Sequence, residues 1–172
     1  MTDMVRLLEP MIPALRRYAR ALLRDRSAAD DLVQDGLERA LSRWHQRRID
    51  GDARSWVFAI LHNLAMNRMR QISRHGPHLT LEDAPEPGLP PLQESGLRHR
   101  DLLRALNVLP DEQRSVLLLV AVEDLSYAEV ATVLGVPVGT VMSRLARGRE
   151  RLRQAMEGEA TLAEKPHLRR IK

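Results

Sequence analysis

The chain has 172 residues, a formal net charge of +4 at pH 7 and no cysteine. That length fits one or two small domains, and the lack of thiols excludes disulfides and thiolate metal sites, as is typical of a reducing compartment. The longest fully apolar run, residues 116–122, is too short to cross a bilayer, and no apolar signal segment lies near residue 1. We therefore expect a soluble, cytoplasmic protein.

Two helical segments flank a region rich in helix breakers. Residues 76–97 contain five prolines and three glycines, and no helical or strand periodicity survives there. We predict an all-α fold with two small helical domains, residues 1–75 and 98–157, joined by a Pro/Gly-rich linker at 76–97. Residues 158–172 form a polar tail that we expect to be frayed.

A helix with one acidic side is predicted from Ser27, which forms an N-cap signature with Asp30. Its expected buried side runs from Ala29 to Trp44 and includes Leu41. The opposite side carries Asp31, Gln34, Asp35 and Glu38. Because like charges four residues apart disfavour a helix, this acidic side favours a cationic partner; the alternative is a solvated surface. No histidine or third ligand accompanies these carboxylates, so we expect no metal site.

The next predicted helix covers residues 54–74. A stripe outside its apolar side combines an aromatic ring, amides and cations: Trp56, Asn63, Asn67, Arg70 and Arg74. These are the groups that bind bases and phosphates of a single strand. The alternative is a half-buried Trp56 beside ordinary surface residues.

A helix-turn-helix is predicted over residues 125–153. Ser126 and Glu129 form a capping box, Gly135 suits the end of the first helix, and Pro137 suits the start of the second. Helical spacing predicts a buried side at Val138, Val141, Leu145 and Leu152, and an opposite, polar side at Thr140, Ser143, Arg144, Arg147 and Arg151. A basic second helix is typical of DNA readers; the alternative is an αα-hairpin with a solvated basic side.

Three segments together resemble the extracytoplasmic-function (ECF) sigma factors of bacterial RNA polymerase. They are residues 27–41 (SAADDLVQDGLERAL), residues 54–70 (RSWVFAILHNLAMNRMR), and residues 109–152, which start LPDEQRSVLLL and end PVGTVMSRLARGRERL. The resemblance implies a factor that directs core polymerase to promoters and assists DNA melting in a stress or envelope response. It also implies an anti-sigma factor as a further partner.

The resemblance implies a role for each set of residues. Core polymerase would bind Asp31, Gln34, Asp35 and Glu38. Asn63 would line a pocket for a base flipped from the melted non-template strand at the −10 element, flanked by Trp56, Asn67, Arg70 and Arg74. The −35 duplex would meet Thr140, Ser143, Arg144, Arg147 and Arg149.

Three positions depart from the family pattern, and each removes a potential DNA contact: Ala59, Met142 and Ala146. The chain has no GxxxxGK[ST] phosphate loop and no HExxH motif among its histidines. We therefore expect no enzyme activity, no catalytic residue and no cofactor. A stand-alone helix-turn-helix regulator and a sigma-like decoy for an anti-sigma factor remain alternatives.

Overall fold

The computed structural model describes residues 2–47, 51–75 and 94–163, and the regular elements in these ranges are all helical. The predicted all-α fold is therefore confirmed. In chain order the α-helices are α1 (Thr2–Leu8), α2 (Ile12–Leu23), α3 (Arg26–Ser42), α4 (Ala53–His75), α5 (Glu94–Val108), α6 (Asp111–Leu117), α7 (Tyr127–Leu134) and α8 (Val138–Ala163). Single turns of 3-10 helix, η1 (Glu9–Met11) and η2 (Trp44–Gln46), and a π-helix, η3 (Leu118–Val122), complete them.

Residues 76–93 of the predicted linker and 164–172 of the predicted tail lie outside the described residues. The segment after the linker is helical from Glu94, earlier than its apolar periodicity indicated, and α8 continues to Ala163 through the start of the predicted tail. Among the described helices, none combines the length and apolar character needed to cross a membrane.

The cap of α3 differs from the prediction. Asp25, not Ser27, precedes the helix in an extended conformation, and its Oδ1 accepts a hydrogen bond of 2.9 Å from the backbone N–H of Ala28. Arg24 adopts a left-handed conformation with φ of 60°, which ends α2 immediately before this cap. The tight connection places the start of α3 two residues earlier in the chain, so Ser27 lies inside its first turn.

The helix-turn-helix has the predicted local structure. Ser126 and Glu129 form the reciprocal capping box at the start of α7, and Gly135 ends that helix with φ of 66°. The second helix, α8, begins directly after Pro137. Val141 and Leu145 are buried as expected, whereas Val138 is 41% exposed because it occupies the first position of α8, outside the packed turns.

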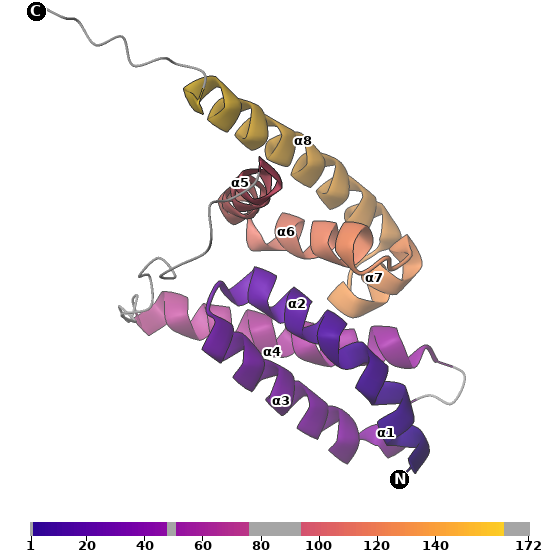
Figure 1. The fold of residues 1–172 in the computed structure, drawn as a ribbon. Helices are drawn as coiled ribbons and strands as arrows, with labels where there is room; N and C mark the ends of the chain where they lie inside the picture. Colours follow the sequence, from indigo (N-terminus) through magenta and orange to yellow (C-terminus); the bar gives the residue numbers. More distant parts are fainter. Residues whose placement is uncertain (1, 48–50, 76–93, 164–172) are drawn as a thin grey trace, which may run out of the picture.

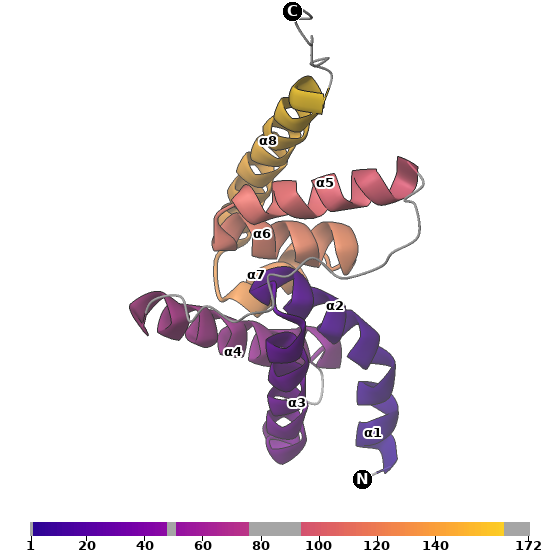
Figure 2. The ribbon, with the colours of Figure 1, turned by 60° about the vertical axis from the view of Figure 1, so that its left-hand side comes forward.

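Each half of the chain forms its own helical layer, and the two layers pack against each other (Figure 1). In the first half, α2 and α3 pack on α4; in the second half, α5, α6 and α7 pack on α8. Figure 2 shows α3 crossing α4 and α5 crossing α8. Contacts of α7 with α4, and of α6 and η3 with α2, join the halves.

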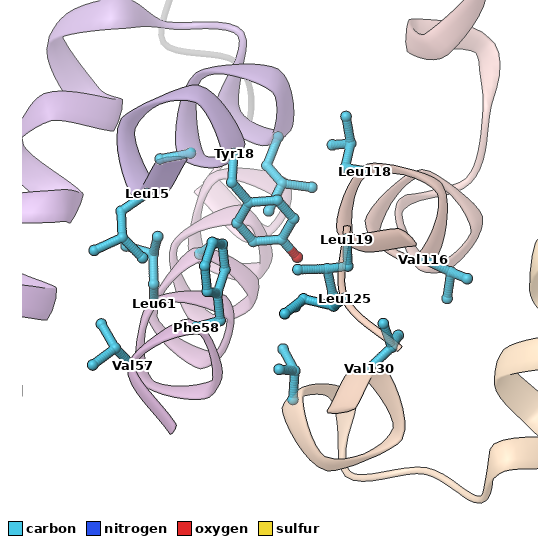
Figure 3. Packing of buried hydrophobic residues seen from close by; sticks show 14 of the residues in the cluster. Leu15, Tyr18, Val57, Phe58, Leu61, Val116, Leu118, Leu119, Leu125 and Val130 are labelled. Carbon is cyan, nitrogen blue, oxygen red and sulfur yellow. The ribbon is translucent and has the colours of Figure 1, made fainter. Parts of the chain in front are cut away.

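One hydrophobic core runs through both halves (Figure 3). The ring of Tyr18 meets Phe58 edge to face at 5.6 Å, and its hydroxyl points toward the side of η3 that carries Leu119. All three side chains are buried. Leu41, which helical spacing placed on the buried side of α3, is instead 39% exposed in the last turn of that helix. The shared core means that the two halves form one packed unit.

Candidate nucleic-acid and partner interfaces

The acidic side of α3 is open to solvent. Its four predicted side chains are all exposed: Asp31, Gln34, Asp35 and Glu38. Gln34 Nε2 donates to Glu38 Oε1 at 3.2 Å, and among the described residues no cation forms an ion pair with Asp31 or Asp35. Asp31 and Asp35 are therefore unpaired within the described chain, and the surface can accept a basic partner.

The opposite side of α3 fixes its position on α4. Gly36 is buried against Leu61, and a Cβ atom at that glycine would come within 3.3 Å of the Leu61 side chain. Arg20 of α2 binds Asp30 in a bidentate ion pair with a shortest distance of 2.8 Å. These contacts hold the helix so that its acidic side points outward.

The residues of the predicted stripe on α4 differ in how far they are exposed. Trp56 is half-buried and packs edge to face on Trp44 at 6.0 Å, while the Arg47 guanidinium lies 4.8 Å above the Trp44 ring. Asn63 lies a further two helical turns along α4 and is exposed. Asn67, Arg70 and Arg74 are also exposed, and Arg70 Nη2 donates to Asn67 Oδ1 at 2.6 Å.

The predicted −35 residues on α8 also differ in their surroundings. Ser143, Arg147 and Arg149 are exposed, and Thr140 is half-buried. Arg147 Nη2 donates to Ser143 Oγ at 3.2 Å. The Arg144 side chain is only 21% exposed, because its Nη2 pairs at 3.2 Å with Glu112 at the start of α6. One of the expected DNA contacts is therefore engaged within the protein.

Two of the clefts between the halves contain predicted DNA-binding residues. The first, of about 480 Å³, places Trp56 and Ala59 of α4 opposite Ala128 and Thr132 of α7. The second, of about 490 Å³, brings Asn63 and Arg70 of α4 to the same cavity as Arg144 of α8. Predicted −10 residues of α4 therefore lie next to the second half of the chain, and Arg144 of the predicted −35 set lies next to the first half.

A buried Tyr–His pair lies beneath the second cleft. The Tyr18 hydroxyl lies 2.9 Å from His62 Nδ1, and both side chains are buried. Burial, and to a lesser degree the positive charge of Arg144, lower the pKa of His62 from 6.5 to about 4, so the imidazole is neutral near pH 7. Burial raises the pKa of the Tyr18 phenol well above its usual value.

Sequence reasoning missed two buried charged groups. Arg114 is 2% exposed and donates to the carbonyl oxygens of Leu106 and Leu109, both at 2.9 Å, near the end of α5. Burial and the charge of Arg24 lower the pKa of this guanidinium. The Glu123 side chain, at the end of η3, is fully buried and accepts two hydrogen bonds from Arg17, at 2.7 and 2.9 Å.

The sequence signal for both groups is weak. Arg114 precedes the long apolar run and Glu123 follows it directly. A charged residue at the edge of such a run is more often a surface residue that ends the helix. Their partners become visible only in the folded chain: Arg114 bonds carbonyls of Leu106 and Leu109, and Glu123 bonds Arg17 of the first half.

These features define a helical DNA-binding protein with a capped helix-turn-helix in its second half. The family description "Sigma2 domain of PhyR" matches residues 8–62, and "Sigma-70, region 4" matches residues 99–152. The ECF RNA polymerase sigma factor EcfG of Rhodopseudomonas palustris is 34% identical over 82% of this chain and 78% of its own length. The ECF sigma factor SigM of Mycobacterium tuberculosis is 37% identical over 80% and 69%, respectively.

A solved structure of a sigma factor also matches the fold of the chain. The sigma factor RpoE of Bartonella quintana, determined with the anti-sigma factor NepR, aligns with a TM-score of 0.76 and 30% identity, covering 91% of this chain and 98% of that one. The chain belongs to the ECF sigma factors of bacterial RNA polymerase. It is thus a subunit that directs the polymerase to promoters at transcription initiation.

Proposed function

We propose that the two halves divide the work of promoter recognition. Residues 1–75 bind core polymerase and the −10 element, residues 98–157 bind the −35 element, and residues 76–97 link them. The observation that carries this proposal is the contrast in charge between two exposed surfaces. The acidic side of α3 offers carboxylates to a basic protein surface, and the arginines of α8 offer cations to phosphates.

In this proposal, Asp31, Gln34, Asp35 and Glu38 form the polymerase-binding surface. Among the described residues no ion pair involves Asp31 or Asp35, and Arg20 pairs with Asp30 on another side of α3. Attraction across such a surface speeds encounter and fixes the orientation of the partner.

Promoter melting rests on Asn63 and its neighbours. An exposed amide can bond the edge of an unstacked base, and Trp56 offers a ring for stacking. Flipping a base costs a few kcal/mol, which stacking and edge hydrogen bonds must return. Asn67, Arg70 and Arg74 continue the surface along α4 and can bind phosphates of the strand.

On α8, Thr140, Ser143, Arg144, Arg147 and Arg149 form the proposed −35 surface. Met142 is 52% exposed and Ala146 is exposed on the same helix, so their uncharged side chains reduce the number of phosphate or base contacts. A weaker dependence of binding on salt concentration follows, because fewer counterions are released.

The proposed partners are core polymerase, promoter DNA and an anti-sigma factor. The last is supported by the similarity to RpoE, whose structure contains the anti-sigma factor NepR. Such a partner fits control by a stress or envelope signal. We assign the protein a non-catalytic role in the cytoplasm, where core polymerase acts.

A second candidate function is that of a decoy that sequesters an anti-sigma factor. It is favoured by the match of residues 8–62 to the sigma-2 domain of PhyR, since a PhyR of Bartonella quintana is described as an anti-anti-sigma factor. The exposed arginines of α8 argue against it, because a decoy has no need of a DNA-binding surface.

Transcription in vitro separates the two candidates. The purified chain is added to core polymerase on a pool of genomic DNA fragments, and the 5′ ends of the transcripts are mapped. A sigma factor produces a defined set of start sites with a shared upstream sequence. A decoy produces none, and that outcome would overturn the proposed function.

A further inference from the structure

The first turns of α8 present apolar side chains to solvent beside the polar ones. Val138 is 41% exposed, Met142 is 52% exposed, and Ala146, one turn further, is exposed as well. Residues four apart lie on the same side of a helix, so these three form one apolar strip, which we call the Met142 strip. The packed side of α8 is a different one, at Val141 and Leu145, and the strip is not part of the core.

The Met142 strip lies at the N-terminal end of the second helix of the helix-turn-helix. In such motifs the N-terminal residues of the second helix reach the edges of base pairs in the major groove. Val138 is the first residue of α8, and Met142 lies in its second turn. Single exposed apolar residues are common on protein surfaces, but these alternate along the helix with the proposed −35 residues Thr140 and Ser143.

Polar side chains of the same turns are engaged within the protein. The Ser143 hydroxyl donates to the carbonyl oxygen of Thr140 at 3.1 Å and accepts from Arg147 Nη2 at 3.2 Å. Arg144 pairs with Glu112 of α6 at 3.2 Å. These groups must exchange partners before they bond to a base edge, whereas an apolar contact by the Met142 strip requires no such exchange.

The first turn of α8 leaves room for a base pair to approach. Gly139 is exposed and carries no side chain, and a Cβ atom at that position would meet nothing within 4 Å. The major groove is about 12 Å wide and admits an α-helix. The backbone of α8 can therefore lie close to the base edges at Gly139, which brings the side chain of Met142, three residues on, within their reach.

One base presents an apolar group in the major groove. Thymine carries a C5-methyl group there, while guanine, cytosine and adenine present hydrogen-bond donors and acceptors. A methionine side chain is flexible and polarisable, so it can adapt to such a group. The exposed arginines that follow on α8, Arg147, Arg149 and Arg151, can bind phosphates and position the helix without reading the sequence.

We propose that Met142, flanked by Val138 and Ala146, recognises the C5-methyl groups of thymines in the −35 element. At these positions the element is read by burial of a methyl group and not by hydrogen bonds to the base. The proposal rests on the proposed function and names the chemical feature that this part of α8 selects. It gives Met142, one of the departures from the family pattern, a role in the choice of promoter.

Deoxyuridine tests the proposal, because it keeps the O4 acceptor of thymine and lacks the methyl group. Holoenzyme formed from the full chain and core polymerase selects from fragments of one mapped promoter, randomised over the −35 region. Each thymine of the selected sequence is then replaced in turn by deoxyuridine, and dissociation constants are measured by fluorescence anisotropy. We expect binding to weaken about fourfold at one or two positions, as the loss of a buried methyl group predicts.

Two variants test whether Met142 causes this uracil penalty. In Met142→Ala the penalty should fall below about twofold, because the partner of the methyl group is gone. Met142→Leu keeps an apolar side chain of similar size and should retain the penalty. The position is exposed, so thermal unfolding of both variants should stay close to that of the unsubstituted chain.

The matched control is Val108→Ala, which shortens an apolar side chain that is 74% exposed at the end of α5 and should leave the uracil penalty unchanged. Equal penalties in Met142→Ala and Val108→Ala, or loss of the penalty in Met142→Leu, would overturn the proposal. A selected element without thymine, or one that tolerates uracil at every thymine, would also overturn it. Failure of the holoenzyme to select any shared sequence would instead overturn the proposed function.

Discussion

The acidic side of α3 and the proposed DNA-binding surfaces of α4 and α8 differ in how much of each is engaged within the protein. The α3 side chains face solvent, with no ion pair to Asp31 or Asp35 among the described residues. The DNA-reading residues are partly engaged: Arg144 pairs with Glu112, Arg70 bonds Asn67, and Trp56 packs on Trp44. On our proposal, the α3 surface is ready for its partner, whereas the DNA-binding side chains must first give up these contacts.

This difference follows from the distribution of charge. On the first half, Arg20 pairs with Asp30 and Arg17 with Glu123, while no cation of the described residues pairs with Asp31 or Asp35. On α8, Arg144 pairs with Glu112 at the start of α6. Whether a charged side chain is available to a partner therefore depends on its contacts in the folded chain and not on its residue type.

The largest expected effect comes from reversing a charge on the ready surface. Asp35→Arg should weaken binding to core polymerase by roughly a hundredfold or more, since facing like charges cost several kcal/mol. Affinity is measured by fluorescence anisotropy of the labelled chain. Thermal unfolding should stay unchanged, because the side chain is exposed.

The matched control is Glu9→Arg, which makes the same charge change at an exposed residue of η1. It should leave affinity for core polymerase close to that of the unsubstituted chain. If Asp35→Arg binds as tightly as this control, the acidic side of α3 is not the polymerase-binding surface.

The pH dependence of stability tests whether the second cleft is closed over His62. Its pKa is lowered to about 4 in the folded chain against 6.5 for an exposed histidine, mainly by burial. As pH falls below 6.5, the unfolded chain binds a proton that the folded chain does not, so stability is lost until about pH 4. The expected loss between pH 7.5 and pH 5 is about 2 kcal/mol.

Urea unfolding at the two pH values measures this loss, and His62→Gln supplies the control. Glutamine can keep a hydrogen bond to Tyr18 without titrating, so the variant should lose about 2 kcal/mol less than the unsubstituted chain over this interval. Identical pH dependence in both proteins would mean that His62 titrates normally and that the cleft above it is open.

A smaller effect is expected from the proposed base-binding residue Asn63. Asn63→Ala should slow promoter opening up to about tenfold, because a hydrogen bond of its amide to a base edge contributes roughly 0.5–1.5 kcal/mol. Binding to closed duplex should change little. Opening is followed by permanganate footprinting of the melted strand with the holoenzyme, and duplex binding by gel shift.

Asn67→Ala is the internal comparison for Asn63. The Asn67 side chain already accepts a hydrogen bond from Arg70, so its removal should affect opening less. Equal losses in opening and duplex binding for Asn63→Ala would mean that this residue has a structural role.

The smallest effect is expected where the partly exposed ion pair between Arg144 and Glu112 competes with DNA. Glu112→Gln releases Arg144, and affinity for a −35 duplex should rise a few-fold, since exposed pairs contribute up to about 1 kcal/mol. Glu150→Gln breaks the pair with Arg153, which lies outside the proposed −35 set, and serves as the control. A rise no larger than in the control would show that Arg144 does not contact the duplex.

Local patterns predicted the helices and their caps well, and tertiary relations poorly. The capping box at Ser126 and the left-handed Gly135 follow from neighbouring residues alone, and both were predicted correctly. The cap at Ser27 was wrong because Asp25, an equally good cap, lies two residues earlier beside the left-handed Arg24. Choosing between them requires the path of the preceding helix.

The relation between the halves was beyond prediction from periodicity. Glu123 follows an apolar run and has the appearance of a solvent-facing residue, yet its partner Arg17 lies 106 positions earlier. A pairing over that separation leaves no local trace in sequence. The polarity of α4 and α8 could be predicted, but not that Asn63 and Arg144 share a cleft.

Complex formation with core polymerase tests the central claim most directly. The purified chain and core polymerase are mixed and separated by size-exclusion chromatography, and the composition of the early peak is measured. The account predicts an equimolar complex that initiates from defined promoters. Separate elution of the two proteins at micromolar concentrations would contradict it.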